Sequence, residues 1–200
     1  MLLKIKNTTL EYHRVGSGPL IILFHSTASS LKQWNSLINL LKNEFEIIAL
    51  NLFGYGLTSK WNENNSPQSL LDHLKLVKPL INNYKDKITF IGHSFGGSVA
   101  MRAGLEYQNK LEKLILLEPN AFFILDKKID TYRDLILRED NREAFIYRSK
   151  NKSVDYTDRL NEIKIPTQIL WGDNDAWIPV ENAKLFAEKI PNVKVDIMKD

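Results

Sequence analysis

A serine, Ser94, stands between glycines in the segment GHSFGG. The G-x-S-x-G spacing is typical of a serine nucleophile on a sharp turn between a strand and a helix. Residues 88–91 predict a buried strand before the turn, and residues 95–104 predict a helix after it. Close neighbours on such a turn must be small, and the hydroxyl then points above the sheet. We interpret Ser94 as a nucleophile; the alternative is a serine that caps the helix.

A serine hydroxyl becomes a strong nucleophile only when a base takes its proton. The attack on a carbonyl carbon also needs N–H groups that stabilise the developing negative charge. The first N–H groups of the helix that follows Ser94 point toward such a charge. The segment therefore predicts acyl-transfer chemistry, provided that a base and further N–H donors lie close to it.

Apolar runs and helical stripes alternate along most of the chain. This alternation predicts an α/β fold, with a mainly parallel sheet and helices on both faces. The first two strands are expected to form an antiparallel hairpin. In the second helix we expect Pro67 in the first turn and a kink or early end at Pro79. The predicted strands are 2–6, 10–15, 20–25, 45–52, 87–92, 111–119, 165–173 and 193–198, and the predicted helices are 31–43, 67–84, 95–104 and 180–190.

Residues 120–164 interrupt the alternation of strands and helices. Their charged sequence with spaced apolar residues fits about two or three amphipathic helices. Such an insertion between two strands is either a lid over the site or a helical cover of the sheet edge. Phe122, Phe123 and Phe145 are candidates to line a substrate pocket or a partner surface.

Composition excludes several classes of function. The net charge is +3 and the charged residues are scattered, which argues against a nucleic acid partner. Cysteine is absent, which excludes disulfides and thiolate chemistry. No run approaches the roughly 18 apolar residues of a membrane span, and no signal peptide is evident, so we expect a cytoplasmic protein that is not in a membrane. No metal site or phosphate-binding loop is evident, so we expect cofactor-free chemistry on a small-molecule substrate or ligand.

Four segments in this order resemble the α/β-hydrolase superfamily: LFHSTASSLKQWNSL, LNLFGYGLTS, GHSFGG and ILWGDNDAWIP. The resemblance runs from about residue 2 to residue 200. It implies a single α/β-hydrolase domain over residues 1–200, with the 120–164 segment as its helical lid. It also implies a serine hydrolase, either esterase-like or acting on a C–C bond.

The resemblance assigns roles to individual residues. Ser94 would be the nucleophile and Asp175 the acid of a catalytic triad. Thr27 and Phe95 would donate backbone N–H groups to the oxyanion. Three further residues would support these loops, namely His25, Ser26 and His93.

Several acidic and polar positions keep alternatives open. Glu118, at the end of another predicted strand, is the second candidate for the acid, because some members of the superfamily place it there. Asp173 is expected only to shape a turn. Ser26 stands where the superfamily usually has glycine, and Asn51 where it has aspartate. We expect the Asn51 change to affect loop stability more than chemistry.

The base of the triad is the largest departure from the superfamily pattern. The usual order is serine, acid and then histidine, but no histidine follows His93 in these 200 residues. We favour a fragment that lacks its C-terminal end. Alternatively, a base comes from elsewhere, such as His25, or the chain is a non-catalytic binding or interaction protein on the same scaffold. A triad without its base keeps only a residual rate.

Overall fold

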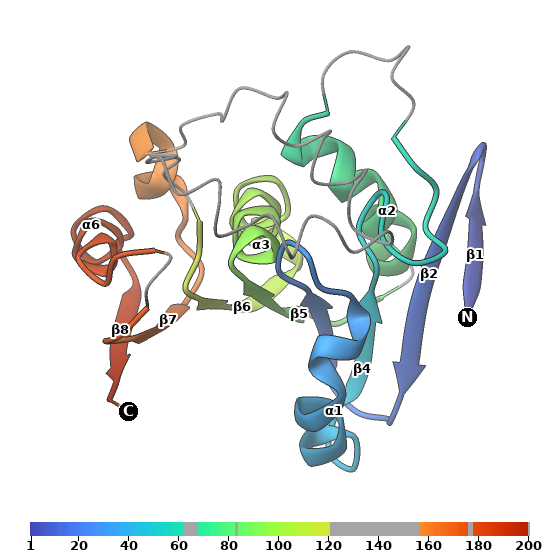
Figure 1. The fold of residues 1–200 in the computed structure, drawn as a ribbon, viewed down its shortest axis with the longest axis horizontal. Helices are drawn as coiled ribbons and strands as arrows, with labels where there is room; N and C mark the ends of the chain where they lie inside the picture. The colour runs from blue at the N-terminus through green and yellow to red at the C-terminus, as the bar shows by residue number, and fades with distance from the viewer. Residues whose placement is uncertain (62–67, 83, 121–156, 176–177, 200) are drawn as a thin grey trace.

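Eight strands form one sheet in the described part of the chain, in the order β1-β2-β4-β3-β5-β6-β7-β8 (Figure 1). The computed structural model describes residues 1–61, 68–82, 84–120, 157–175 and 178–199. The β1–β2 hairpin and the β2–β4 pair are antiparallel, and all other neighbouring strands are parallel. The predicted hairpin and the mainly parallel α/β sheet are therefore confirmed. The strands are β1 Leu2–Ile5, β2 Thr8–Val15, β3 Leu20–Phe24, β4 Glu46–Leu50, β5 Ile88–His93, β6 Leu111–Leu117, β7 Thr167–Gly172 and β8 Val193–Met198.

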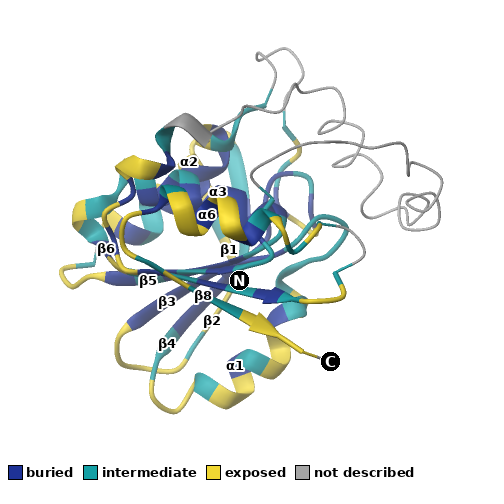
Figure 2. Ribbon diagram, turned by 90° about the vertical axis from the view of Figure 1, so that its left-hand side faces the viewer, coloured by how far each residue is buried: buried dark blue, intermediate teal, exposed yellow. Residues whose placement is uncertain are grey.

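Helices cover both faces of the sheet. Helix α1 (Asn35–Leu41) lies on one face, and α2 (Leu70–Asn82), α3 (Phe95–Glu106) and α6 (Asn182–Lys189) lie on the other (Figure 2). Strand β3 is buried along its whole length, which explains its unbroken apolar sequence. None of the described helices combines the length and the apolar character that crossing a bilayer requires.

The core consists of two apolar clusters, one against each face of the sheet. On the α3 face, the rings of Phe24 and Phe90 meet edge to face with centroids 5.2 Å apart. Leu160 and Ile163 have no exposed surface and belong to the same cluster. The end of the 120–164 segment is therefore part of the core. Residues 121–156, including the three candidate phenylalanines, lie outside the described residues.

Helix α2 differs from the sequence-based expectation at both ends. It begins at Leu70, after Ser69, whose N–H and hydroxyl both donate to the Asp72 carboxylate at 2.8 Å. This serine–acid cap sets the start of the helix, three residues later than predicted. Pro67, which was expected in the first turn, lies outside the described residues. The helix also continues through Pro79 to Asn82, so the predicted early end at Pro79 is wrong, whereas the alternative of a kink stays a prediction. Buried apolar residues around Pro79 outweigh the single hydrogen bond that a proline removes.

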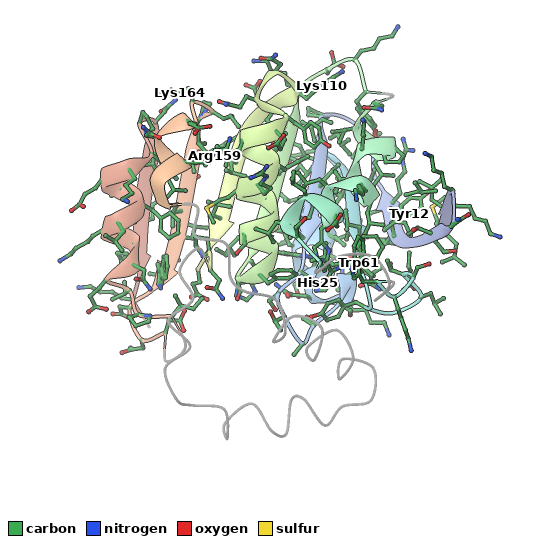
Figure 3. All side chains as sticks on the ribbon, turned by 90° about the horizontal axis from the view of Figure 1, so that it is seen from above. Tyr12, His25, Trp61, Lys110, Arg159 and Lys164 are labelled. Atoms are coloured by element: carbon green, nitrogen blue, oxygen red, sulfur yellow. The ribbon has the colours of Figure 1, made fainter. Side chains whose placement is uncertain are left out.

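The carboxyl ends of the parallel strands meet at one edge of the sheet, because β3, β5, β6 and β7 are consecutive neighbours. The loops after these strands carry His25, Ser94, Glu118 and Asp175. Figure 3 shows His25 at this edge, while Lys110 and Lys164 lie at the opposite end of the molecule. Crevices outside the carboxyl ends of strands are where open α/β sheets bind ligands.

Candidate active site

The backbone of Ser94 is held in an unusual conformation between β5 and α3. Its φ of 51° and ψ of −114° lie outside the helical and extended regions. Its N–H donates to Leu117 O at 2.9 Å, and its carbonyl accepts from the N–H groups of Ser98 and Asn120 at 3.1 and 3.2 Å. Its side chain makes no capping hydrogen bond to the helix and is partly exposed. The structure therefore gives no support to the alternative of a helix-capping serine.

Two glycines allow this turn because backbone packs directly on backbone. A Cβ added to Gly92 would lie 2.3 Å from the carbonyl oxygen of Gly96. A Cβ added to Gly96 would lie 2.2 Å from the carbonyl oxygen of Phe24, in β3. These obstacles are main-chain atoms, so no side-chain rotation can relieve the clash. The G-x-S-x-G spacing is thus a steric requirement of this corner.

Backbone strain is concentrated at the same edge of the sheet. Four non-glycine residues in the described part of the chain have positive φ, and three of them, Ala28, Ser94 and Glu118, follow β3, β5 and β6. Such conformations cost roughly 1–3 kcal/mol each and cluster at functional sites. Three adjoining strained loops mark this edge as the candidate active site.

His25 has no exposed surface and is held by hydrogen bonds at both ring nitrogens. Nε2 accepts from the Leu52 N–H at 3.1 Å, so the proton sits on Nδ1, which donates to Ser26 O at 2.7 Å. Burial lowers the pKa of His25 to about 4, and the Ser26 bond opposes this shift only in part. A neutral ring with both nitrogens engaged ties the loop after β3 to the loop after β4.

Gln33 was not singled out by the sequence, yet it lies between two of the loops. Its Oε1 accepts from both the N–H and the hydroxyl of Ser26 at 3.0 Å, and its Nε2 lies 2.7 Å from His93 Nδ1. The next N–H along the loop, that of Thr27, donates to no group among the described residues. Gln33 therefore connects Ser26 to His93. The spacing of these residues in the sequence gave no signal of this connection.

The two candidate acids have different surroundings. Glu118 has both carboxylate oxygens engaged: Oε2 lies 3.3 Å from His93 Nε2, and Oε1 accepts from the Gly172 N–H at 3.1 Å. Asp175 is partly buried at the end of the loop after β7, and its Oδ1 accepts from the Ile178 N–H at 3.1 Å. Glu118 thus connects two loops, whereas Asp175 sits at the position that the resemblance assigns to the acid.

Asn51 is matched to a neighbouring carboxylate. Its Nδ2 donates to Glu11 Oε2 at 2.7 Å, and its Oδ1 accepts from the Leu31 N–H at 2.8 Å. The same Glu11 oxygen accepts from the Leu57 N–H at 2.7 Å. An aspartate at position 51 would set a second carboxylate against Glu11. The amide of Asn51 therefore fits beside Glu11 better than a carboxylate would. The structure gives no reason to expect that asparagine at this position weakens the loop.

The other two histidines are remote from these hydrogen bonds. His13 is exposed on β2. His73, on α2, is buried and packs its ring against Phe53 and Phe95, with centroids 5.6 and 5.2 Å apart. His73 thus contacts the side chain of the residue after Ser94, a contact that the sequence did not reveal. Among the described residues, no group of three or more acidic or histidine side chains is arranged to hold a metal ion.

Comparisons with known proteins bear on the family and the fold of the chain. A family model described as alpha/beta hydrolase fold matches residues 19–145. A pimeloyl-[acyl-carrier protein] methyl ester esterase of Legionella pneumophila (strain Paris) is 26% identical over 222 positions, spanning 94% of this chain and 88% of that protein. Human epoxide hydrolase 4 is 29% identical over 128 positions, spanning 60% of this chain and 35% of that protein. The solved enol-lactonase from Burkholderia xenovorans LB400 shares the fold, with a TM-score of 0.82, 16% identity, and coverage of 99% of this chain and 91% of that one.

The buried His25 predicts a loss of stability in acid. Its folded pKa of about 4 lies below the ordinary 6.5, so the unfolded chain takes up a proton that the folded chain refuses as the pH falls between these values. The free energy of unfolding should drop by about 3 kcal/mol over this window. Denaturant unfolding from pH 7 to pH 4 measures the drop, and His25→Asn should remove that share of it. Equal pH dependence in both proteins would contradict the prediction.

The glycine contacts predict that Gly96→Ala disrupts the turn. The added Cβ meets the Phe24 carbonyl, so the helix must shift, and we expect a loss of at least about 2 kcal/mol of stability. Gly104→Ala, in the same helix, is the matched control, because its Cβ meets only the flexible side-chain ends of Leu114 at 3.3 Å and Ile165 at 3.6 Å. Thermal unfolding of the two variants should separate them clearly; equal melting temperatures would count against a backbone contact at Gly96.

Proposed function

Because the chain belongs to the α/β hydrolase family, we propose that it is a serine hydrolase that cleaves an ester or related carbonyl substrate through an acyl-enzyme. The observation that carries this proposal is the strained, partly exposed Ser94 at the carboxyl edge of the sheet, fixed by backbone hydrogen bonds on both sides. A serine held in this way loses little further freedom when it attacks a substrate.

In the proposed reaction, Ser94 Oγ attacks the carbonyl carbon while its proton passes to a general base. The carbonyl oxygen becomes an oxyanion that accepts from the N–H groups of Thr27 and Phe95. Collapse of this intermediate expels the alcohol and leaves an acyl group on Ser94, which water then hydrolyses. The Thr27 N–H, without an acceptor among the described residues, supports this role, and so does the position of Phe95 at the start of α3.

The surrounding groups have supporting parts in this proposal. Asp175 orients the general base through its carboxylate. His25, Ser26 and His93 hold the loops that present Thr27 and Ser94. Both ring nitrogens of His25 and of His93 are engaged in hydrogen bonds, so the proposal uses neither ring as the general base that receives the Ser94 proton.

The substrate in this proposal is a small molecule. The name of the Legionella relative, a methyl ester esterase, supports an ester as the bond that is cleaved. At 26% identity, the acyl group of that relative's substrate is not assigned to this chain. Cleavage of a C–C bond next to a carbonyl uses the same serine and the same N–H donors, and pocket shape decides between such substrates.

A second candidate is a non-catalytic binding protein on the same scaffold. It is favoured by the hydrogen bonds of His25 and His93, because each ring uses both nitrogens to hold loops together. Fold alone does not decide between a hydrolase and a binding protein. In this case small apolar esters or acids would bind at the same edge without being turned over.

A serine-reactive fluorophosphonate tests the proposal. We expect the full-length protein to form an adduct at Ser94, identified by mass spectrometry of its peptides, and to hydrolyse short-chain esters. Ser94→Ala should abolish the adduct and lower kcat by at least about 10³-fold, because the nucleophile itself is lost. Ser36→Ala, at an exposed serine in α1, is the matched control for a serine outside the turn. No adduct, together with a raised melting temperature in the presence of small esters, would favour the binding protein instead.

A further inference from the structure

One side-chain amide joins the loop after β3 to the turn that carries Ser94. Gln33 lies in the 3₁₀ helix Leu31–Trp34, which precedes α1. Its Oε1 accepts two hydrogen bonds from Ser26, one from the N–H and one from the hydroxyl, both at 3.0 Å. Its Nε2 lies 2.7 Å from His93 Nδ1. The residues that follow its two partners along the chain are Thr27 and Ser94, the proposed oxyanion donor and the proposed nucleophile.

The direction of these hydrogen bonds is fixed by chemistry. The Ser26 N–H can only donate, so the oxygen of the Gln33 amide must face it and the NH₂ group must face His93. His93 Nδ1 then accepts, and the ring proton sits on Nε2. That proton points to Glu118 Oε2 at 3.3 Å. A flipped amide would set two donors against each other, so only one arrangement satisfies every group.

The hydrogen bonds continue to the loop that carries the proposed acid. Glu118 Oε1 accepts from the Gly172 N–H at 3.1 Å, and the loop after Gly172 leads to Asp175. The series therefore runs from Ser26 through Gln33, His93 and Glu118 to Gly172, in the order of strands β3, β5, β6 and β7 in the sheet. It connects the loops after all four of these strands.

Three of the four connected loops hold a residue in a strained conformation. Ala28 and Ser94 have φ of 58° and 51°, and Glu118 has φ of 45°. Such conformations persist only where the surroundings over-determine them. An oxyanion site needs its donor nitrogens about 2.7–3.1 Å from the developing charge, which leaves a tolerance of only a few tenths of an ångström. Backbone contacts at Gly96 and the hydrogen bonds of the Ser94 backbone also join neighbouring loops. The side-chain series adds a constraint that runs from the loop after β3 to the loop after β7.

We propose that Gln33 is a positioning residue for the oxyanion site, holding the Thr27 N–H at a fixed distance from Ser94 through Ser26 and His93. His93 and Glu118 extend this constraint to the loop of Asp175. This inference rests on the proposed function, because it assigns a purpose to the spacing between the nucleophile and the oxyanion donors. Gln33 itself touches neither Ser94 nor the substrate in this proposal.

Gln33→Met tests the inference, because methionine matches the length of glutamine but cannot form these hydrogen bonds. We expect the second-order rate of Ser94 labelling by a fluorophosphonate, and kcat for a short-chain ester, to fall by about 10- to 100-fold. KM should change by less than about twofold, because the oxyanion contacts strengthen only in the transition state. Lys32→Met, an exposed neighbour in the same 3₁₀ helix, is the matched control and should behave like the parent.

Two further variants guard against a merely structural effect. Gln33→Leu can neither accept from Ser26 nor donate to His93, so it too should slow labelling; if Gln33→Met does not fold, this comparison decides alone. In the double variant of Gln33→Met with His93→Phe, the rate should be no lower than in the slower single variant, because both changes break the same connection.

The outcomes are distinguishable. If the parent protein is not labelled, the proposed function fails and this inference fails with it. If the parent is labelled and both Gln33 variants are labelled at its rate, only this inference fails. A rate loss of equal size in Lys32→Met, a higher KM with unchanged kcat, or multiplied losses in the double variant would each overturn it as well.

Discussion

The contact of backbone with backbone beneath Ser94 is the constraint on which the site depends. Helix α3 begins so close to β3 that Gly96 leaves no room for a Cβ against the Phe24 carbonyl. This approach brings the first N–H groups of α3 next to the loop after Phe24, where the other proposed oxyanion donor lies. At the same corner Ser94 has a positive φ, and its side chain makes no capping hydrogen bond to the helix. The proposed nucleophile and the proposed N–H donors therefore lie around one close contact.

Polar side chains with both ends engaged hold the loops around that contact. His25 spans the loops after β3 and β4 as a buried, neutral ring. Asn51 does the same between β2 and the start of the first helical segment, through Glu11 and the Leu31 N–H. In each case a donor and an acceptor on one side chain meet complementary groups on separate segments. Such matched groups stabilise a single arrangement, because any shift would leave a buried polar atom unsatisfied.

Much of the fold could be predicted from local patterns. The hairpin, the buried strands and the helix after Ser94 follow from apolar periodicity and turn residues. The errors have local physical reasons: Ser69 and Asp72 cap α2 three residues later than expected, and apolar packing by Leu76, Val77 and Ile81 carries the helix past Pro79. The strand–turn–helix at Ser94 was predictable because the turn requires small residues at positions 92 and 96, and both lie close to Ser94 in the sequence.

The sequence by itself determined the class of fold and the turn that presents Ser94, because both depend on residues close together along the chain. Tertiary structure alone decided which side chains connect the loops. Gln33 and His93 are 60 positions apart, and Glu118 and Gly172 are 54 apart. They meet because the order of strands in the sheet makes β3, β5, β6 and β7 neighbours. A hydrogen bond between distant segments leaves no periodic trace in the sequence, since its geometry depends on how the whole sheet is assembled.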